Sequence, residues 1–326
     1  MNEKKRALTF LAVAAALLLL FTLLVCLVNS RASVQTVGIC FRNTQENEEH
    51  CALLRQTLAN AGYAVIVADA NNDPAAQSQQ LASFVEQEVD ALVIEPAGDA
   101  QQLALQAKQA NIPAVFIGYE APQTALDSWE KLAYVGCQAQ QHGILQGSIL
   151  MNNADKGDIN GDGVISYLII TGPEGDLRAE QQAEGCVSAL AQTGLTGSAI
   201  GVEWGAWSKD RSREVCAQAL SHYGKDIEVI FCADDTLAAG ALEAIEKGGW
   251  QAGTDYYLLG IGGTSQAVGA VRDGLMTGTV SENWTGKAEK VLELIRKFCN
   301  EEAVEKLNYV NCSPVHRDNV QEYLPK

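Results

Sequence analysis

The sequence has 326 residues, of which 47% are hydrophobic and 19% are charged, so it can form a large folded core and does not have the composition of a disordered chain. This length favours about two domains of ordinary size. The formal net charge of −17 argues against nucleic-acid binding, because contacts to phosphates need clustered Lys and Arg side chains.

Residues 1–34 differ in composition from the rest of the chain. Basic residues at positions 4–6 precede an apolar run from Ala7 to Val28, which is the pattern of an export signal. The run is longer than the roughly 7–15 residues of a signal-peptide core, which favours an uncleaved membrane anchor. The alternative is a signal peptide cleaved after Ala32. In both cases we expect the folded part outside the cytoplasm, either periplasmic or anchored at the cell surface.

After residue 34, short apolar runs alternate with amphipathic stretches of helical length. The first series has expected strands at 37–41, 64–68, 91–96 and 113–118, with helices near 47–61, 75–88 and 99–110. A helix near 138–153 leads to a second series, with strands at 166–172, 198–204, 227–233 and 256–263 and helices near 178–194, 209–223, 235–247 and 264–274. This alternation predicts an α/β protein with two doubly wound parallel-sheet lobes, which bind a ligand in a cleft at the carboxyl ends of their strands.

The segment GDINGDGVIS, at 157–166, has the oxygen spacing of a calcium loop. Oxygens fall at loop positions 1, 3, 5, 7 and 9, with Gly163 at the sharp turn. The expected ligands are the side chains of Asp158, Asn160, Asp162 and Ser166 and the backbone carbonyl of Val164. Position 12 is Ile169, where an EF-hand has a bidentate glutamate. A further carboxylate must therefore come from elsewhere in the chain.

From about Val37 to Asn319, the sequence resembles the bacterial periplasmic galactose/glucose-binding proteins, which are type 1 periplasmic sugar-binding proteins. The resemblance is strongest at ALDSWEKLAYVG (125–136), the calcium loop, the segment IEVIFCADDTLAAGALEAI that begins at residue 227, and TGTV (277–280). It implies that Glu228 completes the calcium site. It also implies a periplasmic-binding-protein-like type I fold with a hinge near Cys137, Glu282 and Pro314. The expected lobes are 35–136 plus 284–312, and 137–283 plus 313–326, the second of which carries the calcium loop.

The same resemblance implies where the ligand pocket lies, but most of the family's pocket side chains are replaced in this sequence. The expected pocket residues are Arg42, Glu46, Asp176, Arg178, Gln182, Trp207, Asp234 and Glu282, of which only Trp207 keeps the family's stacking aromatic; Trp204 is the alternative wall. Gly118 and Gly262 replace hydrogen-bonding side chains, which is expected to open volume and to leave hydroxyls of glucose unpaired, at ~1–3 kcal/mol each. The excess of acidic residues favours a cationic, zwitterionic or amino-substituted ligand.

The nine cysteines include Cys26 in the apolar segment and eight in the exported part. An even number outside the cell permits disulfides. Because the chain has no Cys-x-x-Cys pair, and Cys40 and Cys232 lie in apolar strands, we expect mostly buried thiols and no metal site built on cysteine. Cys186 and Cys216 are the candidate bridge between neighbouring helices.

The leading functional interpretation is a monomeric solute-binding protein that serves the permease of an ABC transporter or a membrane sensor, with Ca²⁺ as a structural ion. The alternative is a membrane-anchored ectodomain of the same fold that has lost sugar binding and acts in signalling or as a structural module. An enzyme is disfavoured, because the four histidines are scattered and show no triad-like pattern. Among them, His50 and His222 are expected on solvated helix faces.

Overall fold

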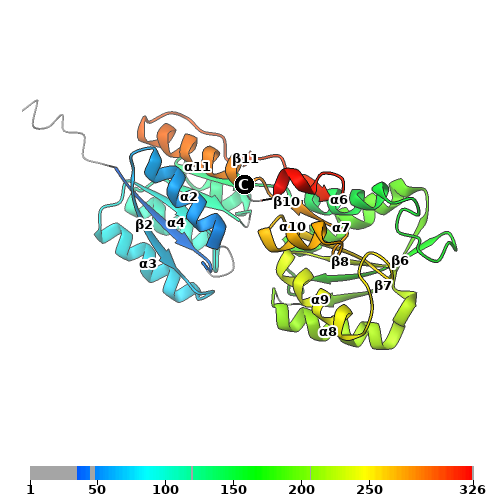
Figure 1. The fold of residues 1–326 in the computed structure, drawn as a ribbon. Coiled ribbons are helices and arrows are strands. Elements are labelled where there is room, and N and C mark those ends of the chain that lie inside the picture. Colours follow the sequence, from blue (N-terminus) through cyan, green and yellow to red (C-terminus); the bar gives the residue numbers. More distant parts are fainter. Residues whose placement is uncertain (1–34, 45–47, 119, 206, 325–326) are drawn as a thin grey trace, which may run out of the picture.

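The computed structural model describes residues 35–44, 48–118, 120–205 and 207–324. In this part of the chain, two six-stranded sheets with flanking helices lie in separate halves of an elongated molecule (Figure 1). The predicted fold class is therefore confirmed. The expected export or anchor segment at 1–34 falls outside the described residues, and among those that are described, no helix has the length and apolar character needed to cross a membrane.

The first sheet is parallel throughout and has the strand order β11-β5-β4-β3-β1-β2. Its strands are β1 (Thr36–Phe41), β2 (Ala64–Asp69), β3 (Ala91–Ile94), β4 (Ala114–Ile117), β5 (Leu132–Gly136) and β11 (Leu307–Tyr309). One face is covered by α2 (Glu48–Asn60) and α11 (Trp284–Cys299). The other face is covered by α3 (Pro74–Glu86), α4 (Ala100–Ala110) and α5 (Gln123–Asp127). Apolar cores on both faces explain the continuous apolar runs of the strands.

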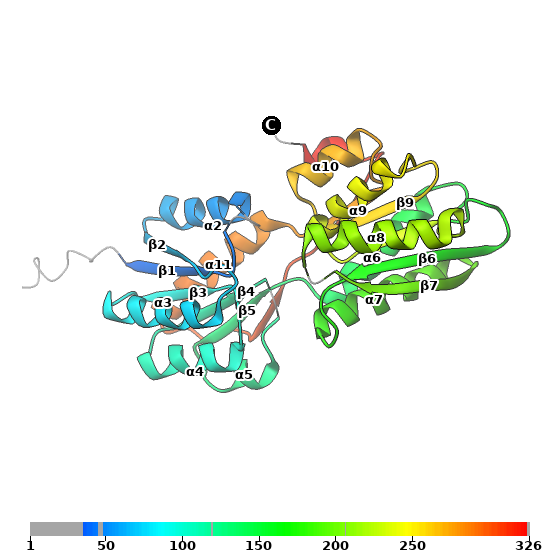
Figure 2. The ribbon, with the colours of Figure 1, turned by 90° about the horizontal axis from the view of Figure 1, so that it is seen from below.

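The second sheet has the order β12-β10-β9-β8-β6-β7, and only β12 runs antiparallel to its neighbour. Its strands are β6 (Val164–Thr171), β7 (Thr196–Trp204), β8 (Val229–Cys232), β9 (Tyr257–Gly262), β10 (Gly278–Ser281) and β12 (Ser313–His316). Helices α6 (Ala139–Ser148) and α7 (Leu177–Leu190) lie on one face, and α8 (Lys209–Tyr223), α9 (Asp235–Lys247) and α10 (Ser265–Arg272) lie on the other (Figure 2). Short 3₁₀ turns are η1 (Ile149–Asn152), η2 (Ala191–Thr193), η3 (Gly224–Asp226) and η4 (Val320–Tyr323).

Within the described residues, the chain passes between the two sheets at three places. These crossings lie between β5 and α6 at 137–138, between β10 and α11 at 282–283, and between β11 and β12 at 310–312. The expected hinge positions Cys137 and Glu282 therefore begin the first two crossings. Pro314 does not lie in the third crossing, because it is already paired with Val280 in the second sheet.

The candidate bridge between Cys186 and Cys216 is wrong. Cys186 lies on α7 and packs with Ile169, whereas Cys216 lies on α8 and packs with Ile170. Neighbouring residues of a strand point to opposite faces, so the sheet separates the two thiols. The described disulfide instead joins Cys137 to Cys312, and both Cys186 and Cys216 are free and buried.

Most helices that follow a strand begin at a side chain that caps the helix. The capping residues, each of which accepts a hydrogen bond from a backbone N–H of the first turn, are Asp73, Asp99, Asp176, Ser208, Asp234 and Thr264. These positions follow the carboxyl ends of parallel strands. The same edge of each sheet therefore carries both the helix starts and the polar side chains of the cleft.

Candidate functional site

A polar cleft lies between the lobes at the carboxyl ends of their strands. It receives Arg42 after β1, Glu95 after β3, Asp234 after β8 and Glu282 after β10. Its full lining is Arg42, His50, Glu95, Gly118, Arg178, Asp234, Asp235, Thr236, Ile261, Gly262, Thr264, Glu282 and Trp284. Both lobes contribute charged groups, so a molecule held here contacts both sheets at once.

The two cleft glycines do not leave open volume, which corrects the expectation from the sequence. A Cβ atom added at Gly118 would lie 2.9 Å from Oε1 of Glu95, and one added at Gly262 would lie 2.8 Å from Oδ2 of Asp235. Both glycines have positive φ angles, of +75° and +142°. The space of two polar side chains is thus filled by carboxylates from neighbouring positions, one in each lobe.

These two buried carboxylates differ in how they are held. Asp235 accepts hydrogen bonds from Thr279 Oγ1 and the backbone N–H of Thr264, and burial raises its pKa to about 6. Glu95 accepts the backbone N–H of Arg42 on Oε2, and burial raises its pKa although the Arg42 side chain opposes the change. Asp235 is fixed within its lobe by bonds to α10 and β10, and Glu95 is fixed within the other lobe by the backbone of Arg42.

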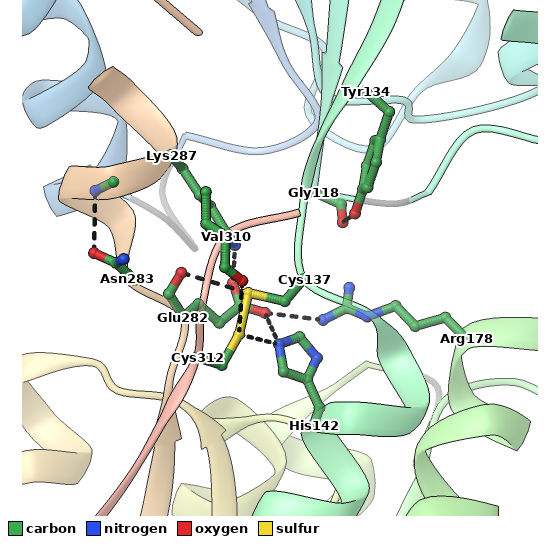
Figure 3. Close-up of a disulfide and its surroundings, with 11 residues drawn as sticks. Gly118, Tyr134, Cys137, His142, Arg178, Glu282, Asn283, Lys287, Val310 and Cys312 are labelled. Carbon is green, nitrogen blue, oxygen red and sulfur yellow. Dashed lines mark hydrogen bonds and ion pairs between the residues drawn. A yellow bond between two sulfur atoms is a disulfide. The ribbon is translucent and has the colours of Figure 1, made fainter. Parts of the chain in front are cut away.

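Glu282 lies at the second crossing and joins groups from both lobes (Figure 3). Its Oε2 lies 2.7 Å from Nζ of Lys287, and its Oε1 lies 3.5 Å from Nε2 of His142 and 3.7 Å from Nη2 of Arg178. Burial alone would raise the pKa of Glu282, but these neighbours, Lys287 first, hold it well below its ordinary value. The carboxylate is therefore charged and ties α11 to α6 and α7.

A second cavity, of about 340 Å³, adjoins the cleft through Gly118 and Arg178, which line both. Asp176 lies on its wall, caps α7 and accepts a hydrogen bond from Nε1 of Trp207 at 3.3 Å. The Arg178 guanidinium lies 5.5 Å from the centre of the Trp207 ring. Asp176, Arg178 and Trp207 thus form one packed group beside the cleft.

The structure does not bring every expected pocket residue to the cleft. Gln182 is buried on α7 and lines neither cavity. Trp207 packs over Gly172 and against the core of the second lobe, and it also lines neither cavity. Glu46 lies outside the described residues.

An aromatic and cationic stack lines the first-lobe side of the cleft, which the sequence did not reveal. The His50 ring stacks on Trp284 at 3.8 Å between centroids, and Nζ of Lys287 lies 3.8 Å from the centre of the same Trp284 ring. Burial lowers the pKa of His50 to about 4, so the imidazole is neutral near pH 7. The expectation of a solvated His50 is wrong, because α11 returns to the first lobe and covers it.

The loop at 158–166 and Glu228 come together as the sequence predicts. Glu228 precedes β8 and is buried; its Oε1 accepts the backbone N–H of Asn160 and its Oε2 accepts that of Ser166. Asp158 accepts three backbone N–H groups, from residues 161, 162 and 163. Neither carboxylate forms an ion pair with a described Lys, Arg or His.

This donor set fits a hard cation. A carboxylate offers about four lone-pair sites, so these hydrogen bonds leave sites free on both Asp158 and Glu228. Gly161 and Gly163, with φ angles of +76° and +87°, provide the tight turn of the loop. Two buried carboxylates that are balanced only by N–H dipoles favour a cation between them.

Residues 49–303 match the sequence profile of the family described as periplasmic binding protein domain. The chain belongs to this family. The match spans both lobes and the two crossings that contain Cys137 and Glu282, and it confirms the resemblance inferred from the sequence.

Curated relatives of this periplasmic binding protein match over most of their length. The D-galactose/methyl-galactoside binding periplasmic protein of Haemophilus influenzae is 26% identical over 81% of this chain and 83% of its own. A putative rhizopine-binding protein of Rhizobium meliloti is 25% identical over 92% and 96%. Among solved structures, an ABC transporter periplasmic solute binding protein from Actinobacillus succinogenes with bound D-allose has a TM-score of 0.78 at 18% identity, covering 89% of this chain and all of that one.

Two signals for the missed cleft residues of this periplasmic binding protein were present in its sequence. Glu95 directly follows the apolar run ALVI of β3, and Asp235 lies three positions after Cys232, the last residue of β8. A polar residue at the end of a parallel strand faces the ligand edge of the sheet. His50 and Trp284 carry no such signal, since 234 residues separate them (284 − 50) and only the folded chain stacks them.

Proposed function

We propose that this protein is an extracytoplasmic solute receptor that encloses one polar small molecule between its lobes and presents the closed form to the permease of an ABC transporter or to a membrane sensor. Membership of the periplasmic binding protein family supports the class. The two-lobed arrangement with three crossings supports closure about a hinge, which is a common way to enclose a ligand. We infer no enzymatic role.

We infer the class of ligand from the side chains that line the cleft. Carboxylates of Glu95, Asp234 and Glu282 face the side chains of Arg42 and Arg178 across one cavity. The names of the relatives that bind galactosides and D-allose support a polyhydroxylated ligand. The mixed charges favour one that also carries an amino group or both charges, because charged groups of a ligand are matched by lining groups of opposite sign.

Unpaired polar atoms in the cleft support direct ligand contact. Nδ1 of His50 and Nε1 of Trp284 are both buried and have no hydrogen-bond partner among the described residues. Both side chains line the cleft. A polyol or amino-polyol that supplies hydroxyl groups at these atoms would remove the cost of leaving them unpaired.

We also propose Ca²⁺ as a structural ion in the second lobe. Asp158, Asn160, Asp162, Val164, Ser166 and Glu228 would hold it. When bound, the ion neutralises the two buried carboxylates and joins the loop to β8. It lies in the second lobe alone, so its role is stability of that lobe and not contact with the solute.

The function is tested by mass spectrometry of small molecules released from the denatured protein, followed by thermal-shift titration with neutral sugars, cyclitols, amino sugars and amines. A ligand of the native state raises the melting temperature. Asp234→Asn keeps a capping side chain for α9 but removes one cleft charge, so it should weaken an amino-substituted ligand about tenfold or more. Asp99→Asn, at an N-cap that lines neither cavity, should leave binding unchanged.

If no compound is released and none raises the melting temperature, the receptor proposal fails. The ectodomain that has lost solute binding then becomes the better account. If only neutral sugars bind, the receptor role stands and the charged ligand class is wrong.

A further inference from the structure

Cys137, His142, Glu282 and Cys312, which we call the hinge cluster, bring together ligands of different chemical types at the hinge. Cys137 lies at the first crossing, Glu282 at the second and Cys312 at the third, while His142 lies in the first turn of α6 (Figure 3). The two cysteines are joined as a disulfide across 175 residues of sequence. The disulfide connects the first and third crossings, and Sγ of Cys137 lies 3.7 Å from the backbone carbonyl oxygen of Glu282 at the second.

The spacing of the hinge cluster suits a metal ion once the disulfide is opened. Nε2 of His142 lies 3.2 Å from Sγ of Cys312 and 3.5 Å from Oε1 of Glu282. Two ligands of one tetrahedral Zn²⁺ ion lie about 3–4 Å apart, given Zn–S near 2.3 Å and Zn–N or Zn–O near 2.0–2.2 Å. The ligand atoms of Cys137, His142 and Cys312 all lie within 4.8 Å of one another, and the two sulfur atoms must separate by rotation of their side chains.

We propose that the reduced hinge cluster binds one divalent cation of the zinc class through Cys137, Cys312, His142 and Glu282. Two thiolates, one imidazole and one carboxylate form a four-ligand set of the type that zinc prefers, whereas calcium prefers oxygen ligands. The proposal rests on the hinge alone and is independent of the identity of the solute.

The surroundings provide a second shell and an entry path. Lys287 contacts Oε2 of Glu282 at 2.7 Å, so it orients the carboxylate and leaves Oε1 toward His142 and Arg178. Cys137 and His142 line the cavity of about 340 Å³ beside the cleft, through which an ion can enter from solvent.

The two states of the hinge cluster interconvert by balanced chemistry. A dithiol reductant converts the Cys137–Cys312 disulfide to two thiols and is itself oxidised to a disulfide. A divalent cation then displaces the two thiol protons and binds both sulfurs. A disulfide oxidant reverses the sequence and expels the cation. The disulfide and the metal each join the first and third crossings, whereas the free dithiol leaves them unlinked.

The test uses the full chain, reduced anaerobically with a phosphine that is then removed, and titrated with Co²⁺ in the presence of excess Ca²⁺. We expect one equivalent to give thiolate-to-cobalt charge-transfer absorption and the visible bands of a tetrahedral ion, both lost on addition of Zn²⁺. The oxidised protein should give neither. A reduced wild type without these bands overturns the proposal.

Variants assign the ligands. Replacing both cysteines, Cys137→Ser with Cys312→Ser, should abolish the charge-transfer band, and His142→Gln or Glu282→Gln should lower Zn²⁺ affinity by at least ~10-fold. Cys299→Ser removes a half-buried thiol on α11, away from the cluster, and should have no effect.

A second readout needs no variant and covers the case in which a variant fails to fold. Oxidation of the zinc-loaded wild type with a disulfide oxidant should release one equivalent of Zn²⁺ to a coloured chelator and make Cys137 and Cys312 resistant to alkylation. Zinc that stays bound after these two cysteines have re-formed their disulfide would show that it sits elsewhere, and would overturn the assignment.

Discussion

The carboxylate of Glu95 lies where a side chain at Gly118 would have to begin. Oε1 of Glu95 is 2.9 Å from the position of a Cβ at residue 118, which is closer than such atoms approach in proteins. The glycine and the glutamate therefore depend on each other. A side chain at position 118 would have to displace a buried carboxylate toward Arg42, which is bonded to it through its backbone.

This dependence predicts that Gly118→Ala is more destabilising than alanine at another glycine of the same conformation. Gly249 is the matched control, since its φ is +76° against +75° at Gly118 and a Cβ there would meet nothing within 4 Å. Backbone strain should cost both variants on the order of 1 kcal/mol, and overpacking should cost Gly118→Ala about 1–3 kcal/mol more. Urea unfolding measures both. Equal losses of unfolding free energy would contradict the contact with Glu95.

Removal of calcium should lower the melting temperature of the protein. Native-state binding contributes about 2.7 kcal/mol at a hundredfold excess of Ca²⁺ over its Kd. Asp158→Ala and Glu228→Gln should each melt like the chelated wild type and no longer respond to EDTA. Asp155→Asn changes a nearby acid that bonds Tyr257 outside the loop, and it should keep the response. A wild type that melts identically with EDTA and with Ca²⁺ rules out the ion.

We expect no micromolar binding of D-glucose or D-galactose, although a relative is named for galactosides. Gly118 and Gly262 offer no side-chain donor or acceptor, and the carboxylates behind them already accept hydrogen bonds from groups of their own lobes. A neutral hexose would leave hydroxyls unpaired at ~1–3 kcal/mol each. Titration calorimetry of the calcium-loaded protein tests this. A micromolar Kd for either sugar would refute the prediction.

The pH dependence of stability should carry a contribution from His50. Its pKa is lowered to about 4 in the folded protein from an ordinary value of 6.5, so the unfolded chain binds more protons between these pH values. Stability therefore rises with pH from about 4 to about 6.5, by up to about 3 kcal/mol from this group.

His50→Phe keeps a ring to stack on Trp284 and removes this titration. The difference between the unfolding free energies of the wild type and the variant, measured by urea at several pH values, should grow in favour of the wild type as pH rises from about 4 to about 6.5. Asp235, whose raised pKa acts with the opposite sign, is common to both proteins and cancels. A difference that does not change with pH would mean that His50 titrates normally.

Much of the fold was readable from periodicity, because buried parallel strands are continuous apolar runs. The helices expected at 209–223 and 235–247 have those bounds in the structure. Helices α5 and α11 and strands β5, β10, β11 and β12 were not recognised from the pattern. All of these except α5 lie next to a crossing, and β11 and β12 are only three and four residues long. Edge strands of this length carry too few alternating residues to show a period.

The candidate site was predictable where local spacing determines it. The loop at 158–166 spans nine consecutive residues, so its proposed cation ligands could be named from local spacing, and Glu228 could be named from the resemblance. The shape of the cleft could not be predicted in this way, because it depends on which side chains fill the space beside each glycine. Glu95 fills the space beside Gly118, and Asp235 fills the space beside Gly262. Likewise, the pairing of Cys137 with Cys312 follows from where the crossings meet, which no spacing of cysteines reveals.

The last strands of the described chain have a consequence for how the protein is made. β11 pairs with β5 at the edge of the first sheet, and β12 pairs with β10 at the edge of the second. Each sheet is therefore completed by a segment synthesised after residue 306. The β5–β11 pair joins residues that are far apart in sequence, and such contacts form slowly. Neither lobe can complete its sheet before β11 and β12 have been synthesised. A polypeptide that must cross a membrane before it folds benefits from this delay, because transport precedes the pairing that would complete both lobes.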